Sequence, residues 1–503
     1  MLSYTLEVKE WGIWGMWAYF LPAFLVVSAS SSVVALSSGG ALFIEKQICL
    51  NRQRVNSPGD GWTFLKHRHS SEGCERIEQE PEKPRDAREE CQYFMNVPFP
   101  EHREGRMGRK TYIEAFDPEG KSRSVCEKCG LCLQQCPVMK MEKAESQAEM
   151  GRLLKGEETQ RVLNECTFCF GCNHYCPQGL RPYALIMERA AEKNRKTGKG
   201  IPSFVDYLLT GKTDSCIFWD VYATQSDEEK AILDKWQLVP PRSPEVLFIG
   251  CVGREIPSGT EHSRVFEGLP KYAPRDACCG ELAYRYGDYR AFAETVERTR
   301  DMLNRLDTER LVCYCGSCAN YLGNVWPNYH GVKLPFAIVS VWEWLWEKYR
   351  NGEIRVERPI DRKIALADSC YSSELGDGFL DAVRGLHQAV GMEVVELENN
   401  RFDNLTCGTV SILRNNYDLR EGTKETKRKM GQVLNTRVGD LSCYCPGCYM
   451  QLRGAAKRSN IQPHYALEEI LWAFGDEYPV PLEQRAAKQT ELFIEKVKAS
   501  FTG

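Results

Sequence analysis

Two identical cysteine runs constrain the fold of this chain more than any other feature. Each has the spacing C-x2-C-x2-C-x3-C-P, and the second begins 40 residues after the first. In such a run the first three thiolates wrap one iron–sulfur cubane, while the fourth ligates the other cluster. A zinc site is disfavoured because zinc rarely uses four cysteines so close together. The predicted [4Fe-4S] ligand sets are Cys126, Cys129, Cys132 with Cys176, and Cys166, Cys169, Cys172 with Cys136.

The residues around these runs are expected to be helical. Residues 142–164 are rich in Ala, Glu, Lys, Leu and Gln with apolar side chains at helical spacing, and residues 187–196 continue likewise. We therefore place an α-helical two-cluster ferredoxin domain at residues 105–200 and a connector at 201–243.

The block at residues 244–350 is expected to contain short strands that each end at a cysteine. Apolar residues 245–250 precede Cys251, and residues 310–314 precede Cys315. Ligands collect where the strands of an open parallel sheet end, so these thiols and those of the intervening Cys-Cys-Gly element should converge. The candidate set is Cys251, Cys278, Cys279, Cys315 and Cys318.

The block at residues 360–475 repeats this plan with one departure. Segments 363–368 and 442–444 match the strands of the first block, which makes gene duplication the simplest cause. Thr406 stands where the first block has Cys278, and threonine is a poor iron ligand. The second site is expected to hold a conventional cluster, a smaller cluster or none. Its remaining cysteines are Cys370, Cys407, Cys445 and Cys448.

Some residues of these blocks lie outside the ligand pattern. Cys313 and Cys443 fall inside the expected strands, and we expect them to be buried core thiols. Arg254 is expected either to hold an anionic substrate group or to lie on the surface. A run of basic residues is expected to form a solvated helix face: Lys424, Lys427, Arg428 and Lys429.

The N-terminal residues 1–48 leave alternatives open. Residues 11–44 carry no charge, which is long enough for a transmembrane helix. Basic residues follow them, an order that would leave the body of the protein in the cytoplasm, attached to the inner face of the cytoplasmic membrane. Serines and glycines dilute the signal, so a buried helix or a wrongly assigned start are the alternatives. A polar linker is expected at residues 49–104 and a C-terminal tail at 476–503.

Composition excludes several classes of function. A net charge of −4 gives no field for a nucleic-acid backbone, so no nucleic-acid partner is expected. Twenty-three clustered cysteines in 503 residues indicate metal binding in a reducing compartment rather than disulfides. No Gly-x-Gly-x-x-Gly follows a strand and there is no phosphate loop, so no flavin or NAD is expected in this chain. A redox partner must therefore exchange electrons with it.

The chain resembles the catalytic subunit of heterodisulfide reductase and its relatives over residues 124–472. The resemblance rests on the two ferredoxin-type runs followed by Cys278-Cys279-Gly280 and Thr406-Cys407-Gly408. It implies a multidomain chain, with an α-helical ferredoxin domain followed by two duplicated α/β cysteine-rich CCG domains. It also implies that the five cysteines of the first block bind a noncubane [4Fe-4S] cluster and are catalytic.

This resemblance gives two hypotheses for function. In the first, electrons pass through two cubanes to the noncubane cluster for disulfide/thiol redox chemistry, in a cleft between the two blocks. Its redox partner would be a flavoprotein, a membrane cytochrome or a small thiol protein, and its substrate a disulfide or thiol. The alternative is a non-catalytic iron–sulfur relay of a flavin-dependent dehydrogenase, for glycolate, lactate or glycerol 3-phosphate, that feeds quinone. The incomplete second block and the N-terminal stretch favour this alternative.

Overall fold

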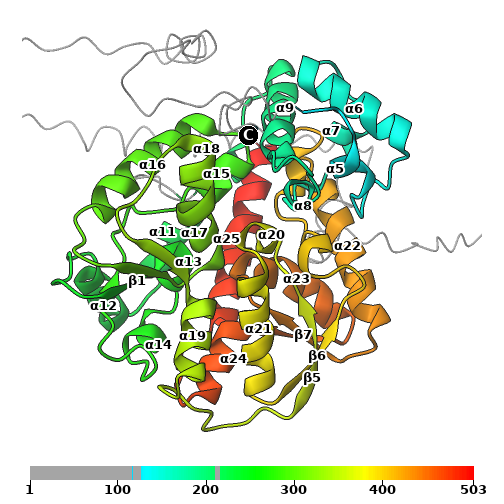
Figure 1. Cartoon of the computed structure of the whole chain (residues 1–503). Helices are drawn as coiled ribbons and strands as arrows, with labels where there is room; N and C mark the ends of the chain where they lie inside the picture. The colour runs from blue at the N-terminus through cyan, green and yellow to red at the C-terminus, as the bar shows by residue number, and fades with distance from the viewer. Residues whose placement is uncertain (1–115, 117–125, 210–215, 503) are drawn as a thin grey trace, which may run out of the picture. The chain divides into compact units, whose positions relative to one another are not determined.

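The computed structural model describes residues 116, 126–209 and 216–502 (Figure 1). The anchor expected in residues 1–48 and the linker expected at 49–104 lie outside these residues. Among the helices of the described part, none is both long enough and apolar enough to span a bilayer.

Short helices surround the two cysteine runs, as the sequence predicts. The stretch expected to be helical, residues 142–164, contains two helices, because the chain turns out of the first one at Gly156, where φ is 72°. The left-handed region suits glycine, which commonly ends helices in this way. The helices of this domain are α5 (Leu131–Gln134), α6 (Lys143–Lys155), α7 (Val162–Glu165), α8 (Gly171–His174) and α9 (Pro182–Lys196).

A buried carboxylate fixes the turn between α6 and α7. The side chain of Glu149 is fully buried and accepts hydrogen bonds of 2.9 Å from the backbone N–H groups of Gln160, Arg161 and Val162. Arg152 Nη1 donates a further bond of 2.7 Å. Burial alone would raise the pKa of Glu149, but these donors outweigh it and hold the pKa below its ordinary value. The carboxylate therefore satisfies the first N–H groups of α7, which precedes Cys166.

The two cysteine-rich blocks each fold into a four-stranded parallel sheet with the same strand order. The order is β2-β1-β3-β4 in the first sheet and β6-β5-β7-β8 in the second. Helices cover the sheets, as parallel strands require (Figure 1). The strands are β1 (Glu245–Phe248), β2 (Lys271–Tyr272), β3 (Arg310–Cys313), β4 (Ala337–Ser340), β5 (Arg362–Ala367), β6 (Met392–Glu396), β7 (Asp440–Cys443) and β8 (Gln462–Tyr465).

The helices of the two blocks correspond only in part. The first block contains α13 (Gly250–Gly253), α14 (Pro257–Glu261), α15 (Glu281–Arg285), α16 (Tyr289–Leu303), α17 (Gly316–Asn320), the π-helix η1 (Tyr321–Val325), α18 (Trp326–His330) and α19 (Val341–Arg350). The second contains α20 (Ser372–Leu375), α21 (Asp377–Ala389), the 3-10 helices η2 (Arg401–Asp403) and η3 (Ser411–Leu413), α22 (Leu419–Asn435), α23 (Pro446–Arg458) and α24 (Ala466–Ala473).

Strand register brings the cysteines to one edge of each sheet. Phe248 of β1 pairs with Cys313 of β3, so the chain leaves both strands at the same level, close to Cys251 and Cys315. Ala367 of β5 pairs in the same way with Cys443 of β7. Neither Cys313 nor Cys443 has any exposed surface, which confirms that they are core thiols.

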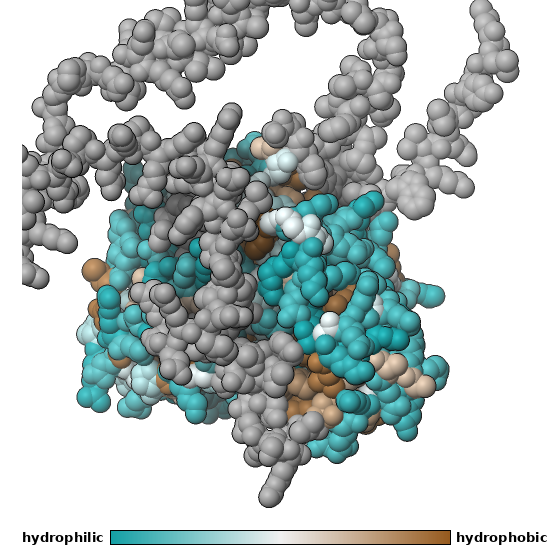
Figure 2. Space-filling view, turned by 90° about the horizontal axis from the view of Figure 1, so that it is seen from above, coloured by the Kyte–Doolittle hydropathy of each residue, from teal (hydrophilic) through white to brown (hydrophobic). Residues whose placement is uncertain are grey.

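The two blocks pack against each other through helices α19 and α21. The rings of Trp342 and His387 stack with centroids 6.2 Å apart. A Cβ atom on Gly385 would lie 2.6 Å from the ring of Trp346, so only glycine allows this approach. The face shown in Figure 2 is mainly hydrophilic, with smaller hydrophobic areas between the polar side chains.

The C-terminal helix α25 (Leu482–Thr502) packs on the connector that follows the ferredoxin domain. That connector contains α10 (Ser203–Asp206), α11 (Ile217–Ala223) and α12 (Asp227–Trp236). The rings of Phe204 and Phe493 meet edge to face at 6.2 Å, and Arg485 Nε donates to the backbone oxygen of Glu255 at 2.9 Å. The expected tail is therefore an ordered part of the fold.

The substitution Glu149→Gln should destabilise the ferredoxin domain by about 1–3 kcal/mol at pH 7, because an amide cannot accept from all four donors. Urea unfolding of the full chain, followed by circular dichroism, measures this loss. A carboxylate with a lowered pKa stabilises above its unfolded pKa and loses that effect as pH falls through its folded pKa. The difference between the variant and the wild type should therefore shrink below about pH 4. An equal difference at pH 7 and pH 3 would contradict this role of the carboxylate.

Candidate metal centres

The two ferredoxin-type runs adopt the same unusual backbone conformation. The residues two and four positions after the first cysteine have positive φ in both runs: 57° at Lys128 and 77° at Gly130, then 58° at Phe168 and 67° at Phe170. Such alternation turns successive N–H groups toward one point, which suits an anionic group. The N–H of Phe168 donates to Cys166 Sγ at 3.4 Å.

The thiols of these runs group across the two runs rather than within each one. Burial raises the pKa of Cys132, and the nearby Cys176, Cys126 and Cys129 raise it further. Burial followed by the charge of Cys169 raises the pKa of Cys136 to about 11. The fourth cysteine of each run thus lies near cysteines of the other run: Cys176 near Cys126 and Cys132, and Cys136 near Cys166, Cys169 and Cys172. This is the arrangement that two interleaved cubanes need, and ligation itself stays a prediction.

The five thiols of the first cysteine-rich block lie together at the edge of its sheet. The pKa of Cys251 is well above its ordinary value because its thiol hydrogen-bonds with that of Cys278 and is buried, with Cys279 and Cys315 nearby. Cys279 in turn hydrogen-bonds with Cys278 and Cys318. Five thiols linked in this way form a donor set for iron.

The second block brings together its four thiols. Cys448 hydrogen-bonds with Cys407 and Cys445, and Cys370 lies near both of these. The hydrogen bond from Cys448 lowers the pKa of Cys407 to about 6 despite its burial.

Thr406 occupies the place that Cys278 has in the first block. The N–H of Gly408 donates to Thr406 Oγ1 at 3.3 Å, and the N–H of Gly280 donates to Cys278 Sγ at 3.4 Å. The hydroxyl keeps this local hydrogen bond but provides no thiolate. The two sites therefore share a loop conformation and differ by one ligand.

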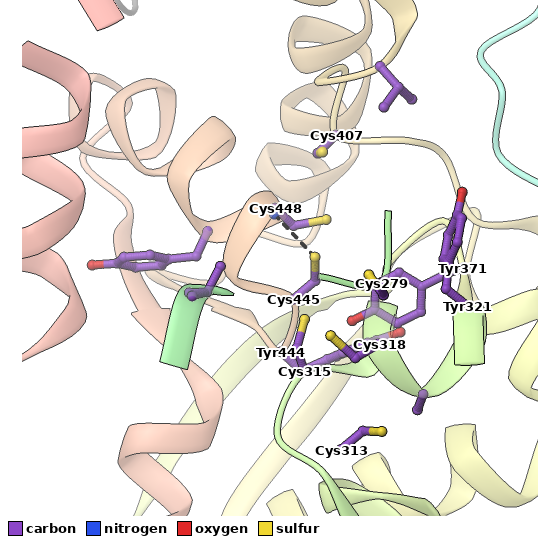
Figure 3. Close-up of a cluster of buried hydrophobic side chains, with 14 of the residues drawn as sticks. Cys279, Cys313, Cys315, Cys318, Tyr321, Tyr371, Cys407, Tyr444, Cys445 and Cys448 are labelled. Atoms are coloured by element: carbon purple, nitrogen blue, oxygen red, sulfur yellow. Dashed lines mark hydrogen bonds between the residues drawn. The ribbon is translucent and has the colours of Figure 1, made fainter. Parts of the chain in front are cut away.

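The two cysteine-rich sites lie close to one another. Figure 3 shows thiols of the first block beside thiols of the second, with Tyr371 and Tyr321 alongside them. Tyr371 is near enough to Cys445 and Cys315, one thiol from each block, for both to influence its pKa. A Cβ atom on Gly316 would lie 2.6 Å from Tyr371 Oη. Tyrosine thus stands where the two blocks approach each other.

Buried hydroxyl groups beside these sites fit a bound group with acceptor atoms. Among the described residues, the hydroxyls of Tyr183, Tyr321 and Tyr371 are buried and have no hydrogen-bond partner. A buried hydroxyl without a partner is costly, and a cluster with sulfide acceptors would satisfy it. Within residues 126–209 and 216–502, no three His, Cys, Asp or Glu side chains converge on a single metal ion. The thiolates of a cubane bind different irons, so they do not need to converge on one point.

The expectation for Arg254 is wrong in both of its forms. Its side chain is only 4% exposed, and its guanidinium donates to three backbone oxygens just before Cys278: those of Pro274, Arg275 (2.9 Å) and Ala277 (2.9 Å). Arg254 therefore holds the loop that presents Cys278 and is not free to bind an anionic substrate.

Lys429 has a matching role in the second block. The exposed Lys424 and Lys427 follow the expected solvated face, but Lys429 is fully buried. Its Nζ donates at 2.7 Å to the backbone oxygens of Asp368 and Leu405, which precede Cys370 and Cys407. The sequence signal is its place on the buried stripe of α22, since it lies three residues after Thr426 and four before Val433.

Comparison with known proteins identifies the same domains in the same order. A 4Fe-4S dicluster domain matches residues 122–180, and a cysteine-rich domain matches residues 246–323 and again 364–453. The chain is 23% identical over 337 residues to a subunit of the dihydromethanophenazine:CoB--CoM heterodisulfide reductase of Methanosarcina barkeri, covering 63% of this chain and 80% of the relative. It is also 23% identical over 392 residues to a subunit of the fumarate reductase (CoM/CoB) of Methanothermobacter marburgensis, covering 73% and 76%.

Arg254 and Lys429, which we call the loop clamps because each holds a cysteine-bearing loop, give a matched pair of variants. Arg254→Gln should lower the iron bound by the first cysteine-rich site, because three carbonyls before Cys278 lose their donor. Lys429→Gln should lower the iron bound by the second site alone. Iron and sulfide per polypeptide, determined on anaerobically purified protein, measure each total loss, and EPR spectra of the reduced protein show which site has lost its cluster. If each variant lost the same amount of iron from both sites, the clamps would be general stabilisers rather than local ones.

Proposed function

We propose that this chain, an iron–sulfur protein of the heterodisulfide reductase type, is the oxidoreductase subunit in which electrons from a partner protein reach a disulfide at the first cysteine-rich site. The observation that carries the proposal is the convergence of five buried or half-buried thiols at the end of strands β1 and β3. A noncubane [4Fe-4S] cluster on Cys251, Cys278, Cys279, Cys315 and Cys318 would supply single electrons and an iron that binds sulfur. The balanced reaction is one disulfide plus two electrons plus two protons giving two thiols.

The side chains around the site contribute exclusion of water and hydrogen bonding. Cys278, Cys279, Cys315 and Cys318 are all buried, so a reduced sulfur species there would be protected from solvent. Burial raises the pKa of Tyr371 well above its ordinary value, so this side chain stays a neutral hydroxyl. Its hydroxyl, which has no partner among the described residues, is available to donate to a thiolate formed between the two sites.

The partners and location complete this proposal. The chain receives electrons from a redox partner protein, which we propose to be a flavoprotein, a membrane cytochrome or a small thiol protein. We place the chain in the cytoplasm. An anchor formed by residues 11–44 would attach it to the inner face of the cytoplasmic membrane.

A second candidate function rests on Thr406. Because its hydroxyl replaces a thiolate, the second site lacks one ligand of the complete set. An incomplete site favours a non-catalytic relay for a flavin-dependent dehydrogenase that feeds quinone. In that case the first cysteine-rich site passes electrons onward and does not bind a disulfide.

The substitution Cys278→Ser tests the main proposal. We expect disulfide turnover to fall at least 100-fold, because one of the five thiolates is lost, while the signals of the reduced ferredoxin cubanes persist. Electron paramagnetic resonance (EPR) spectra recorded during a redox titration, with and without added disulfide, measure the effect. The wild type should show a paramagnetic species that responds to the disulfide and that the variant lacks.

The matched control is Cys313→Ala, which changes a core thiol of strand β3 outside the ligand set. It should keep the disulfide-responsive species. A wild-type protein whose spectra contain only ordinary cubane signals, indifferent to disulfide, would refute disulfide chemistry and support the relay.

A further inference from the structure

Two buried arginines, one from each cysteine-rich block, hold the loop that contains Cys166. Arg285 Nη2 donates to the backbone oxygen of Phe168 at 2.7 Å, and Arg414 Nη1 donates to that of Glu165 at 2.7 Å. Arg285 is 2% exposed and Arg414 is 1% exposed. These bonds lie on either side of Cys166, so both blocks fix the second ferredoxin-type run.

The second ferredoxin-type run lies mainly against the second block. Ser411 Oγ donates to the backbone oxygen of Thr167 at 3.3 Å, and the ring of His174 stacks on Phe402 with centroids 3.9 Å apart. A Cβ atom on Gly171 would lie 3.3 Å from the backbone oxygen of Phe402. The cluster predicted on this run is therefore next to the second cysteine-rich site.

Arg285 alone of the two arginines also reaches a predicted ligand of that site. Its Nη1 donates to Cys370 Sγ at 3.1 Å and to Glu281 Oε1 at 2.9 Å. The hydrogen bonds of Arg414 go instead to backbone oxygens and to Glu425 Oε1 at 2.7 Å. Arginine remains charged in proteins, so its bond to a thiolate is charge-assisted.

We propose that Arg285 is a positioning residue that connects the second ferredoxin cluster to the second cysteine-rich site. Through one guanidinium it holds the Phe168 loop and the sulfur of Cys370, which lie in different domains. A positive charge and a hydrogen bond on a ligand sulfur raise the reduction potential of the attached cluster. With clusters bound at both sites, Arg285 would thus make the second cysteine-rich site the favoured acceptor of an electron from the second ferredoxin cluster. No bond forms or breaks in this step, and a reduced partner protein supplies the electron.

This inference rests on the proposed assignment of a cluster to Cys370, Cys407, Cys445 and Cys448, and it is independent of disulfide chemistry. The test uses the full iron-loaded chain without any disulfide, in an EPR-monitored redox titration. Cys370→Ser identifies the signal of the second site by its loss. Failure of disulfide turnover would leave the result of this titration unchanged, so the two proposals can fail separately.

We expect Arg285→Met to shift the midpoint of the second-site signal to a lower potential. A shift of about 59 mV in the midpoint potential corresponds to a tenfold smaller equilibrium constant for transfer of one electron from the second ferredoxin cluster. Arg285→Lys keeps the positive charge but not the forked geometry, so its midpoint should shift less, in the same direction. This variant serves as the test if Arg285→Met does not fold.

The matched control is Arg414→Lys, which removes the other clamp of the same loop. It should change the signal of the second ferredoxin cluster, whose ligand Cys166 lies near Arg414, and leave the second-site midpoint unchanged. Three results would overturn the proposal: an unchanged second-site midpoint in Arg285→Lys with full iron content, an equal shift in Arg414→Lys, or no second-site signal that depends on Cys370.

Discussion

The electrostatic cost of gathering buried thiolates is the constraint on which the rest of this structure depends. Burial and neighbouring sulfurs raise the pKa of most of the clustered thiols, for example Cys132, Cys172 and Cys279, so iron must displace protons to bind them. Cations placed inside the fold hold the loops that gather these thiols. Four buried cations, Arg254, Arg285, Arg414 and Lys429, each donate to backbone oxygens of a cysteine-bearing loop. They therefore fix the loops that hold the anionic sites, and two of them, Arg285 and Arg414, are in turn paired with Glu281 and Glu425.

The duplicated sheets explain how thiols from distant parts of the chain meet. Each sheet pairs its two central strands in parallel and in the same order, so successive strand ends lie side by side. A ligand set can therefore be built from cysteines far apart in sequence. Thr406 shows that such a loop can keep its conformation after a ligand is lost, because its hydroxyl accepts the same backbone hydrogen bond as Cys278.

Much of this architecture can be predicted from the sequence, because cysteine spacing and short apolar strands are local signals. The strands that precede Cys251, Cys315, Cys370 and Cys445 lie close to the predicted positions. The break at Gly156 escapes prediction because helix propensity outweighs a single glycine in a window of good helix formers. The role of Arg254 escapes it because charge alone does not reveal burial, whereas the burial of Lys429 could have been predicted from its helical spacing to Thr426 and Val433. Arg285 gives no signal, since its contacts join three domains and exist only after these have packed together.

The C-terminal helix has a consequence for how this protein is made. Ser203 of the connector and Ser500 of α25 hydrogen-bond at 2.7 Å although 297 residues separate them. Leu482, Ala486 and Val497 of the same helix are fully buried. The connector therefore cannot complete its core until α25 has been made, and long-range contacts of this kind form slowly. All strands of the two sheets precede α25 in the chain, so the sheets can form while the connector is still open to solvent.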